Sequence, residues 1–188
     1  MCDDNIRLSN FEQKSDGQKE CVMDHIIAWS LKHASIIYKT KQPKLYSYCK
    51  SILSKLLEIN NEEVYFSKVM TALQVPIKGS KQKIDIVCEV TSVKNQKREQ
   101  WALLIEDKYF GNLTNILSDY KNYFDSQYND LHRKYALITC VDKADPNFKK
   151  YDSAEILGFK VFSICELIDK ILPDTESDIY NEFWLRNW

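Results

Sequence analysis

The chain contains little glycine and proline, and this scarcity limits the classes of protein to which it can belong. Only four Gly and four Pro occur among its 188 residues. Flexible linkers, collagen-like repeats and disordered segments are richer in these residues, so we expect none of them. The longest apolar runs are too short to span a bilayer. The first twenty residues are polar and include Asp3, Asp4 and Glu12, which is not typical of a secretory signal. The sequence predicts a soluble globular protein with no membrane partner.

Closely spaced cysteine pairs are also missing. The six cysteines are too far apart to form a CxxC pair, so we do not expect a zinc site. Four or five of them lie in apolar periodic segments, where cysteine acts as a small core residue in a reducing compartment. The three histidines have neither metalloprotease nor triad spacing. We therefore expect a cytoplasmic protein.

Charge of one sign does not dominate the chain, because the formal net charge is −1. The lysines are nevertheless concentrated in two segments, 30–57 and 78–98, and the first of these contains no acid. Local basic surfaces of this kind can hold a nucleic-acid backbone. They can equally be solvated helix faces and a solvated loop. The lysines that we expect to contact nucleic acid are Lys41, Lys44, Lys81 and Lys83.

The periodicity of apolar residues predicts alternating helices and strands in one domain that covers residues 1–188. Helices are expected from Ser15, from Pro43, over 112–127, up to Gly158, from Ser163 to Pro173 and over 178–188. Strands are expected over 64–77, 84–90, 101–108, 134–141 and 159–162, with a polar loop over 93–100. Three consecutive strands suggest a meander, and the later alternation suggests crossover connections. This order predicts the α/β class, as a three-layer α/β/α domain with a central mixed sheet.

Two of the expected strands carry acids inside or at the end of an apolar run. Asp85 interrupts the stretch 84–88, and Glu106, Asp107 and Lys108 close the strand 101–108. Burying a carboxylate is costly unless a positive group meets it. Because residues two apart share a side of a strand, Glu106 and Lys108 should lie together and Asp107 should point away. If the strands are neighbours, two carboxylates and one ammonium converge, which suits a divalent metal ion and a phosphate ester.

These residues resemble the motif of the PD-(D/E)XK nuclease superfamily, which has the restriction-endonuclease-like fold. That family has an αβββαβ core with an Asp on its second strand and Glu-x-Lys or Asp-x-Lys on its third, as Asp85 and Glu106-Asp107-Lys108 stand here. The resemblance covers about residues 16–172 and leaves 174–188 as a helical tail. The strand motif differs from the family pattern in one respect, because Ile84 precedes Asp85 where the family name has proline.

The resemblance extends to the helices on either side of these strands. An acid on the first helix often completes the family site. Glu20 matches it best, and Asp24, one turn later, is the rival. The helix after the third strand carries Gln-Leu-x-x-Tyr in one branch of the family. This chain keeps Leu117 and Tyr120 but has Ile116 in place of the glutamine.

The family implies a nuclease that uses Mg²⁺ or Mn²⁺ to hydrolyse phosphodiester bonds of nucleic acid, with DNA as the expected partner. Asp85 and Glu106 would bind the ion. Asp107 would contribute through its backbone carbonyl rather than its carboxylate. Lys108 would orient the attacking water or stabilise negative charge, and Glu20 would complete the metal shell.

Other interpretations of the same residues remain open. Asp85 can be part of a structural ion pair, Glu106 and Lys108 can be an exposed strand end, and Glu20 can simply favour the positive end of its helix. The alternative function is a catalytically inactive, restriction-endonuclease-like binding or accessory protein. Its contact surface, for a second copy or a partner protein, would be the aromatic C-terminal tail, where Phe183 and Trp184 lie.

Overall fold

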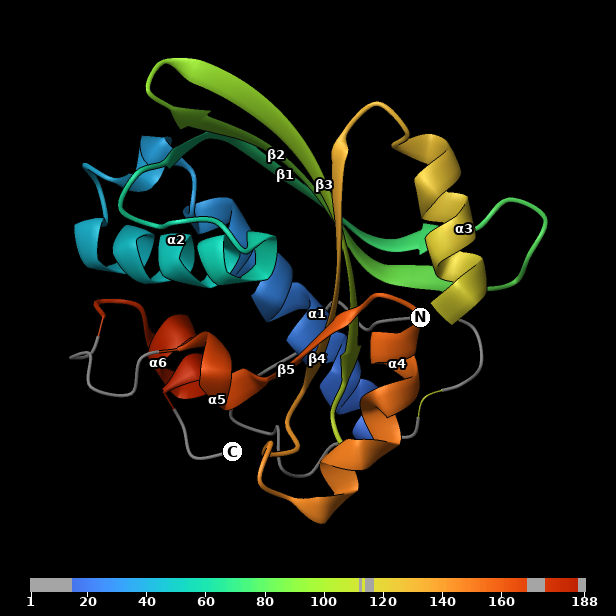
Figure 1. Ribbon diagram of the computed structural model, residues 1–188. Coiled ribbons are helices and arrows are strands. Elements are labelled where there is room, and N and C mark those ends of the chain that lie inside the picture. The colour runs from blue at the N-terminus through green and yellow to red at the C-terminus, as the bar shows by residue number, and fades with distance from the viewer. Residues whose placement is uncertain (1–14, 112, 114–116, 169–174, 186–188) are drawn as a thin grey trace.

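A five-stranded mixed sheet forms the centre of the protein in the computed structural model, which describes residues 15–111, 113, 117–168 and 175–185 (Figure 1). The strands lie side by side in chain order, the first three antiparallel and the last two parallel to their neighbours. The expected mixed α/β class is confirmed. The strands are β1 (Tyr65–Pro76), β2 (Lys83–Lys94), β3 (Lys97–Lys108), β4 (His132–Thr139) and β5 (Lys160–Ser163).

Helices pack on the sheet in two groups, each with its own hydrophobic cluster. The larger cluster joins the sheet to α1 (Asp16–His33), α2 (Pro43–Leu57), α5 (Ile164–Leu167) and α6 (Asp178–Trp184). The smaller joins it to α3 (Leu117–Gln127) and α4 (Asp152–Ile156). The short 3₁₀ helices η2 (Ile36–Tyr38) and η3 (Pro146–Tyr151) lie in the connections. The start of the helix expected over 112–127 and the expected stop at Pro173 lie outside the described residues.

The helix α1 begins where the sequence predicts, because Ser15 and Gln18 form a capping box at its first turn. Its buried side chains, among them Ile27 and Leu31, pack toward the sheet. The indole of Trp184 donates a hydrogen bond of 2.8 Å to the Ser30 hydroxyl, which ties α6 to this helix. The helix therefore holds a fixed position beside the strands.

A tight hairpin replaces the polar loop expected over 93–100. Strand β2 runs to Lys94 and β3 starts at Lys97. Asn95 and Gln96 form the turn, with φ of 49° and 65°, and left-handed values at both positions suit a two-residue hairpin. The hairpin end extends from the sheet at the upper left of Figure 1, where its residues 94–100 are exposed. The expectation of a loop was wrong because an exposed ribbon has no buried face to give it a pattern.

The alternation along β2 changes at Asp85. We expected Ile84 and Ile86 on the same side, but Ile84 packs in the smaller cluster and Ile86 in the larger one. On the neighbouring strand, Gln74 stands between the paired residues of this region and has a left-handed φ of 52°. Asp85 thus lies at the point where successive residues of β2 exchange the sides of the sheet that they face.

The aromatic residues of the tail belong largely to the core. Phe183 and Trp184 have no exposed surface, whereas Ile179 of the same helix is exposed. These two side chains are therefore not exposed contacts, and a partner bound through the tail stays a prediction. Trp188 lies outside the described residues.

The described cysteines mostly follow the expectation of core residues. Cys49, Cys88 and Cys140 are buried thiols. Cys21 does not follow it, because it is half-buried and disulfide-bonded.

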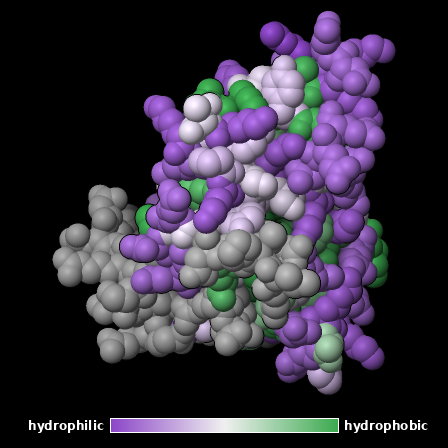
Figure 2. Space-filling model, turned by 90° about the vertical axis from the view of Figure 1, so that its left-hand side faces the viewer, coloured by the Kyte–Doolittle hydropathy of each residue, from purple (hydrophilic) through white to green (hydrophobic). Residues whose placement is uncertain are grey.

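The surface of the molecule is mixed. The face in Figure 2 is mainly hydrophilic where its residues are described, with hydrophobic residues in small separate areas. Among the described helices, none combines the length and apolar character needed to cross a membrane.

Candidate metal centre

Three aspartates from three elements meet at one end of the sheet. Asp24 comes from α1, Asp85 from β2 and Asp107 from β3. One carboxylate oxygen of each lies within 4.8 Å of those of the other two. Oxygen ligands at this spacing suit a hard divalent cation, so the triad could hold a metal ion.

Asp107 is the most deeply placed member of the triad, with 1% of its surface exposed. Neither of its carboxylate oxygens, nor Oδ1 of Asp24, accepts a hydrogen bond from a donor among the described residues. Burial, followed by the negative charges of Asp24 and Asp85, raises the pKa of Asp107 well above its usual range. Burial and the charge of Asp85 raise the pKa of Asp24 to about 7. These orphaned buried oxygens fit a cation, which would relieve both the repulsion and the missing hydrogen bonds.

Glu106 and Lys108 form the second part of the site, on the other side of β3. The Lys108 ammonium lies 2.9 Å from Oε1 of Glu106 and 4.0 Å from Oδ2 of Asp85. It also donates a hydrogen bond of 2.8 Å to the backbone carbonyl of Asp107. The expected sharing of a side by Glu106 and Lys108 is thus found, with Asp107 turned away from them. The Asp107 carboxylate, which we expected to matter less than its carbonyl, lies in the triad instead.

Asp85 belongs to both parts of the site. Its Oδ2 atom accepts a hydrogen bond of 3.2 Å from the backbone N–H of Asp107 and also faces Lys108. This double role follows from the change of side at Asp85, since a residue on a regular strand would serve one face only.

Glu20 approaches the site from the first turns of α1. One carboxylate oxygen accepts a hydrogen bond of 3.2 Å from the backbone N–H of Tyr109, and the other lies 3.8 Å from the Lys108 ammonium. Gly111 packs against this pair, because a Cβ atom built there would lie 3.1 Å from Glu20 Oε1. The structure therefore places both acids of α1 at the site: Glu20 beside Lys108, and its rival Asp24 in the triad.

Three carboxylates surround the single ammonium of Lys108 in this second part of the site. Burial alone lowers the pKa of Lys108, but the carboxylates of Glu106, Asp85 and Glu20 together raise it well above its usual range. Burial and the charge of Asp85 raise the pKa of Glu106. Lys108 therefore stays an ammonium at neutral pH. Tyr120 of α3 lies close to this part of the site. Burial, and then the charges of Glu106 and Asp85, raise the pKa of Tyr120 to about 12.

Gln74 of β1 is a site residue that the sequence does not reveal. Its side-chain nitrogen donates hydrogen bonds of 2.9 Å to Asp24 and 3.3 Å to Asp85. The position falls in an apolar strand with no motif around it, so only its polarity within that run could have drawn attention to it.

The four lysines expected to contact nucleic acid lie at opposite ends of the sheet. All four are exposed. Lys83 begins β2, two residues before Asp85, and Lys81 lies in the preceding turn. Lys41 and Lys44 instead lie at the start of α2, toward the end of the sheet where Ser35 bridges to Phe66 (Figure 1). Only the first pair is close to the acids.

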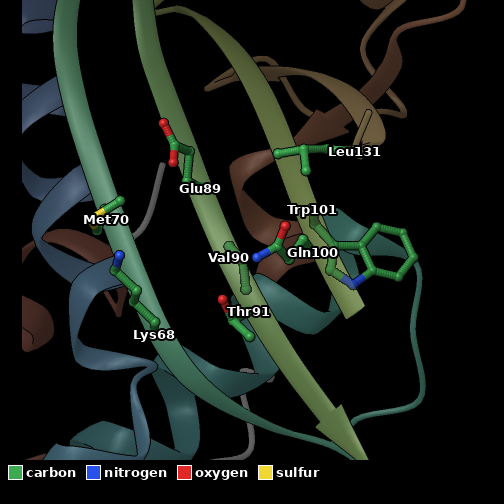
Figure 3. Close-up of a pocket in the computed structure, with 8 residues that line it drawn as sticks. All are labelled: Lys68, Met70, Glu89, Val90, Thr91, Gln100, Trp101 and Leu131. Atoms are coloured by element: carbon green, nitrogen blue, oxygen red, sulfur yellow. The ribbon is translucent and has the colours of Figure 1, made fainter. Parts of the chain in front are cut away.

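A small pocket of about 90 Å³ lies elsewhere on the first three strands (Figure 3). Two of its side chains already have partners: Glu89 accepts a hydrogen bond from Tyr128, and the Trp101 indole donates one to Ser92. None of the expected site residues lines it. The pocket is therefore separate from the acids.

No family model, curated protein or solved structure matches the chain. Inferences about function accordingly depend on the residues described above.

Proposed function

We propose that the protein is a metal-dependent nuclease of the PD-(D/E)XK type, which hydrolyses phosphodiester bonds in nucleic acid, with DNA as the expected substrate. One observation carries the proposal: Lys108, Glu106, Asp85 and Glu20 converge at the strand ends. Beside them lie Asp24 and Asp107, which have three buried carboxylate oxygens without a donor among the described residues. An ion pair at a strand end needs only one carboxylate. A group of acids around one ammonium suits a site that takes up further positive charge.

The arrangement of elements supports the same class. The order α1, β1, β2, β3, α3, β4 corresponds to an αβββαβ core, with α2 inserted between α1 and β1. Helices of the two hydrophobic clusters would form the outer layers of a three-layer α/β/α domain. The acid of the second core strand and the Glu-x-Lys of the third lie at the same end of the sheet.

The residues present fit a Mg²⁺ or Mn²⁺ ion. Asp85 would hold it together with the carboxylates of Asp24 and Asp107, and Glu106 would stay paired with Lys108 on the other side of β3. When bound, the ion would act as a Lewis acid on a phosphate oxygen and lower the pKa of a water molecule. Hydrolysis then needs the chain to position that water and to balance the charge that develops on the phosphate.

Lys108 has the chemistry for charge stabilisation rather than proton abstraction. Because three carboxylates keep it protonated, it would hold a phosphate oxygen or orient the water as a hydrogen-bond donor. Glu20 and Glu106 would fix the ammonium from two sides. About 13% of the Lys108 side chain is exposed, so this side chain is not sealed from solvent.

A catalytically inactive accessory protein is the second candidate, and one observation favours it. The 2.9 Å ion pair between Lys108 and Glu106 is also what a purely structural pair would show. That pair does not account for the orphaned oxygens of Asp107 on the other side of the strand. The two functions differ in whether the acids are needed for cleavage.

The test is cleavage of plasmid DNA, single-stranded DNA and RNA by the purified protein in Mg²⁺, Mn²⁺ or EDTA. Asp85→Asn and Lys108→Gln should abolish metal-dependent cleavage and leave the circular dichroism spectrum unchanged. Asp119→Asn and Lys97→Gln change exposed residues away from the site and should cut like the wild type. Wild-type activity in both Asp85→Asn and Lys108→Gln would defeat the nuclease proposal. Cation binding by the wild type without cleavage of any substrate would favour the accessory protein.

A further inference from the structure

Gln74 occupies an unusual position for a glutamine in a strand. It lies on β1, which pairs only with β2 in the sheet, and its side chain reaches two members of the aspartate triad. Asp24 belongs to a helix and Asp85 to a strand, so a single amide group links three elements. Both acids would otherwise repel each other across this space.

The backbone of Gln74 is strained to reach this position. Its φ is 52°, in the left-handed region, although its neighbours Leu73 and Val75 remain paired with β2. A non-glycine residue in this conformation costs on the order of 1 kcal/mol or more and persists where surrounding structure enforces it. Gln96 has a similar φ of 65°, but there the two-residue turn requires it. Gln74 lies within a strand, where no turn requires a left-handed φ.

A carboxamide can serve the triad in two opposite ways. Its NH₂ group donates to carboxylates, as it does here, and its oxygen is a ligand for hard cations. A divalent cation among the aspartates would repel the NH₂ group and attract the oxygen. A half-turn of the terminal amide exchanges the two with little change in the remainder of the side chain.

We propose that Gln74 is a further residue of the metal centre, which positions the acids without a cation and becomes a ligand when a cation is bound. Its amide holds Asp24 and Asp85 together through hydrogen bonds, and it turns over to present its oxygen when a divalent cation binds. The inference rests on the metal site of the proposed function, and it adds a neutral ligand from the edge strand to a triad of acids.

Calorimetric titration with Mn²⁺ tests the affinity. Gln74→Gly is expected to fold, because glycine adopts this φ without strain, and Gln74→Leu keeps a side chain of similar reach. Both should bind Mn²⁺ at least about tenfold more weakly than the wild type, the usual effect of losing a group that supports a metal ligand. Gln96→Leu makes the same change at a similar φ in the hairpin turn and should bind like the wild type. Affinities of both Gln74 variants within twofold of the wild type would overturn the inference.

The side-chain NH₂ signals of Gln74 in the ¹H–¹⁵N NMR spectrum provide a second readout. They can be assigned because Gln74→Glu removes them. Titration with Mg²⁺ should shift this pair strongly and leave the Gln96 pair in place, since only Gln74 loses its carboxylate acceptors. A Gln74 pair that stays unchanged at saturating Mg²⁺ would overturn the inference.

These outcomes are separable from those of the nuclease proposal. If the wild type binds Mn²⁺ but cuts no substrate, the nuclease proposal is wrong. The Mn²⁺ affinities of the Gln74 variants then still decide the role of Gln74. A wild type that cuts, with Gln74→Gly binding Mn²⁺ equally well, supports the nuclease and overturns the role of Gln74.

Discussion

The backbone N–H of Asp107 donates a hydrogen bond of 3.2 Å to Oδ2 of Asp85. The backbone pairing of β2 with β3 ends at Ile86 and Ile105, so this bond continues the link between the strands through a side chain. It holds the Asp85 carboxylate between the triad and Lys108. The loss of this acceptor would leave a buried N–H without its partner and would separate the two parts of the site.

Asp107→Asn should stabilise the protein in EDTA. The substitution replaces a buried carboxylate that faces two others with a neutral amide that can donate to them. We expect the free energy of unfolding in urea to rise by about 1 kcal/mol or more. The rise in melting temperature on adding Mn²⁺ should become smaller. Asp119→Asn, at an exposed acid, is the control, and a clear loss of stability in Asp107→Asn would contradict the expectation.

Gly111→Ala should impair the site and leave the fold intact. The added Cβ would lie 3.1 Å from Glu20 Oε1 and 3.5 Å from Lys108 Cδ, so both side chains must shift by a few tenths of an ångström. We expect cleavage to slow several-fold and the free energy of unfolding to change by less than about 1 kcal/mol. Gly17→Ala has open space around its Cβ and should not reduce cleavage. Unaltered kinetics in Gly111→Ala would show that the position of Glu20 is unimportant.

The two lysine pairs should contribute differently to binding of nucleic acid. A double Ala variant at Lys81 and Lys83 should weaken binding of duplex DNA and lower the slope of log K against log salt by about 2, roughly one for each phosphate that a lysine no longer neutralises. The same change at Lys41 and Lys44, at the other end of the sheet, should have little effect. Fluorescence anisotropy between about 50 and about 200 mM salt measures both slopes. Equal losses from the two pairs would indicate a much longer binding path than the one proposed.

Glu58 should make stability depend on acid pH. Hydrogen bonds from Lys134 and Lys160 lower the pKa of Glu58 from 4.5 to about 2. A lowered carboxyl pKa stabilises the fold fully above the unfolded value, and that contribution is lost as the pH falls from about 4.5 to about 2. Glu58→Gln should thus cost less than about 1 kcal/mol at pH 7, because the pair is well exposed and screened by salt, and almost nothing near pH 2. Urea unfolding across this pH range measures the difference in free energy of unfolding between the wild type and Glu58→Gln, with Glu62→Gln as the exposed control. A difference that stays constant with pH would contradict the prediction.

The sequence predicted those parts of the fold in which local pattern and tertiary burial agree. The capping boxes at Ser15 and Ser163 marked true helix starts. Strand periodicity placed Glu106 and Lys108 on one side, and the convergence with Asp85 followed only if the two strands were neighbours, as they are. The hairpin at Asn95 was missed because its exposed residues carry no apolar alternation.

The metal centre was predicted only in part, for a reason that lies in the backbone. Regular alternation placed the Asp107 carboxylate away from the other groups, and it does lie on the far side of its strand. The sequence gives no sign that β2 changes sides at Asp85, or that Gln74 is left-handed opposite it. The second α1 acid, Asp24, could be identified as a rival to Glu20, but not as its complement.

The bond between Glu20 and the N–H of Tyr109 has a consequence for how the chain is made. Residues 20 and 109 are almost half the sequence apart, and Gln74, Asp85 and Asp107 lie between them. During synthesis, therefore, the ribosome must have released the third strand before any cation pocket can close. An incomplete copy carries the acids scattered along an unfinished polymer and has no place where they meet.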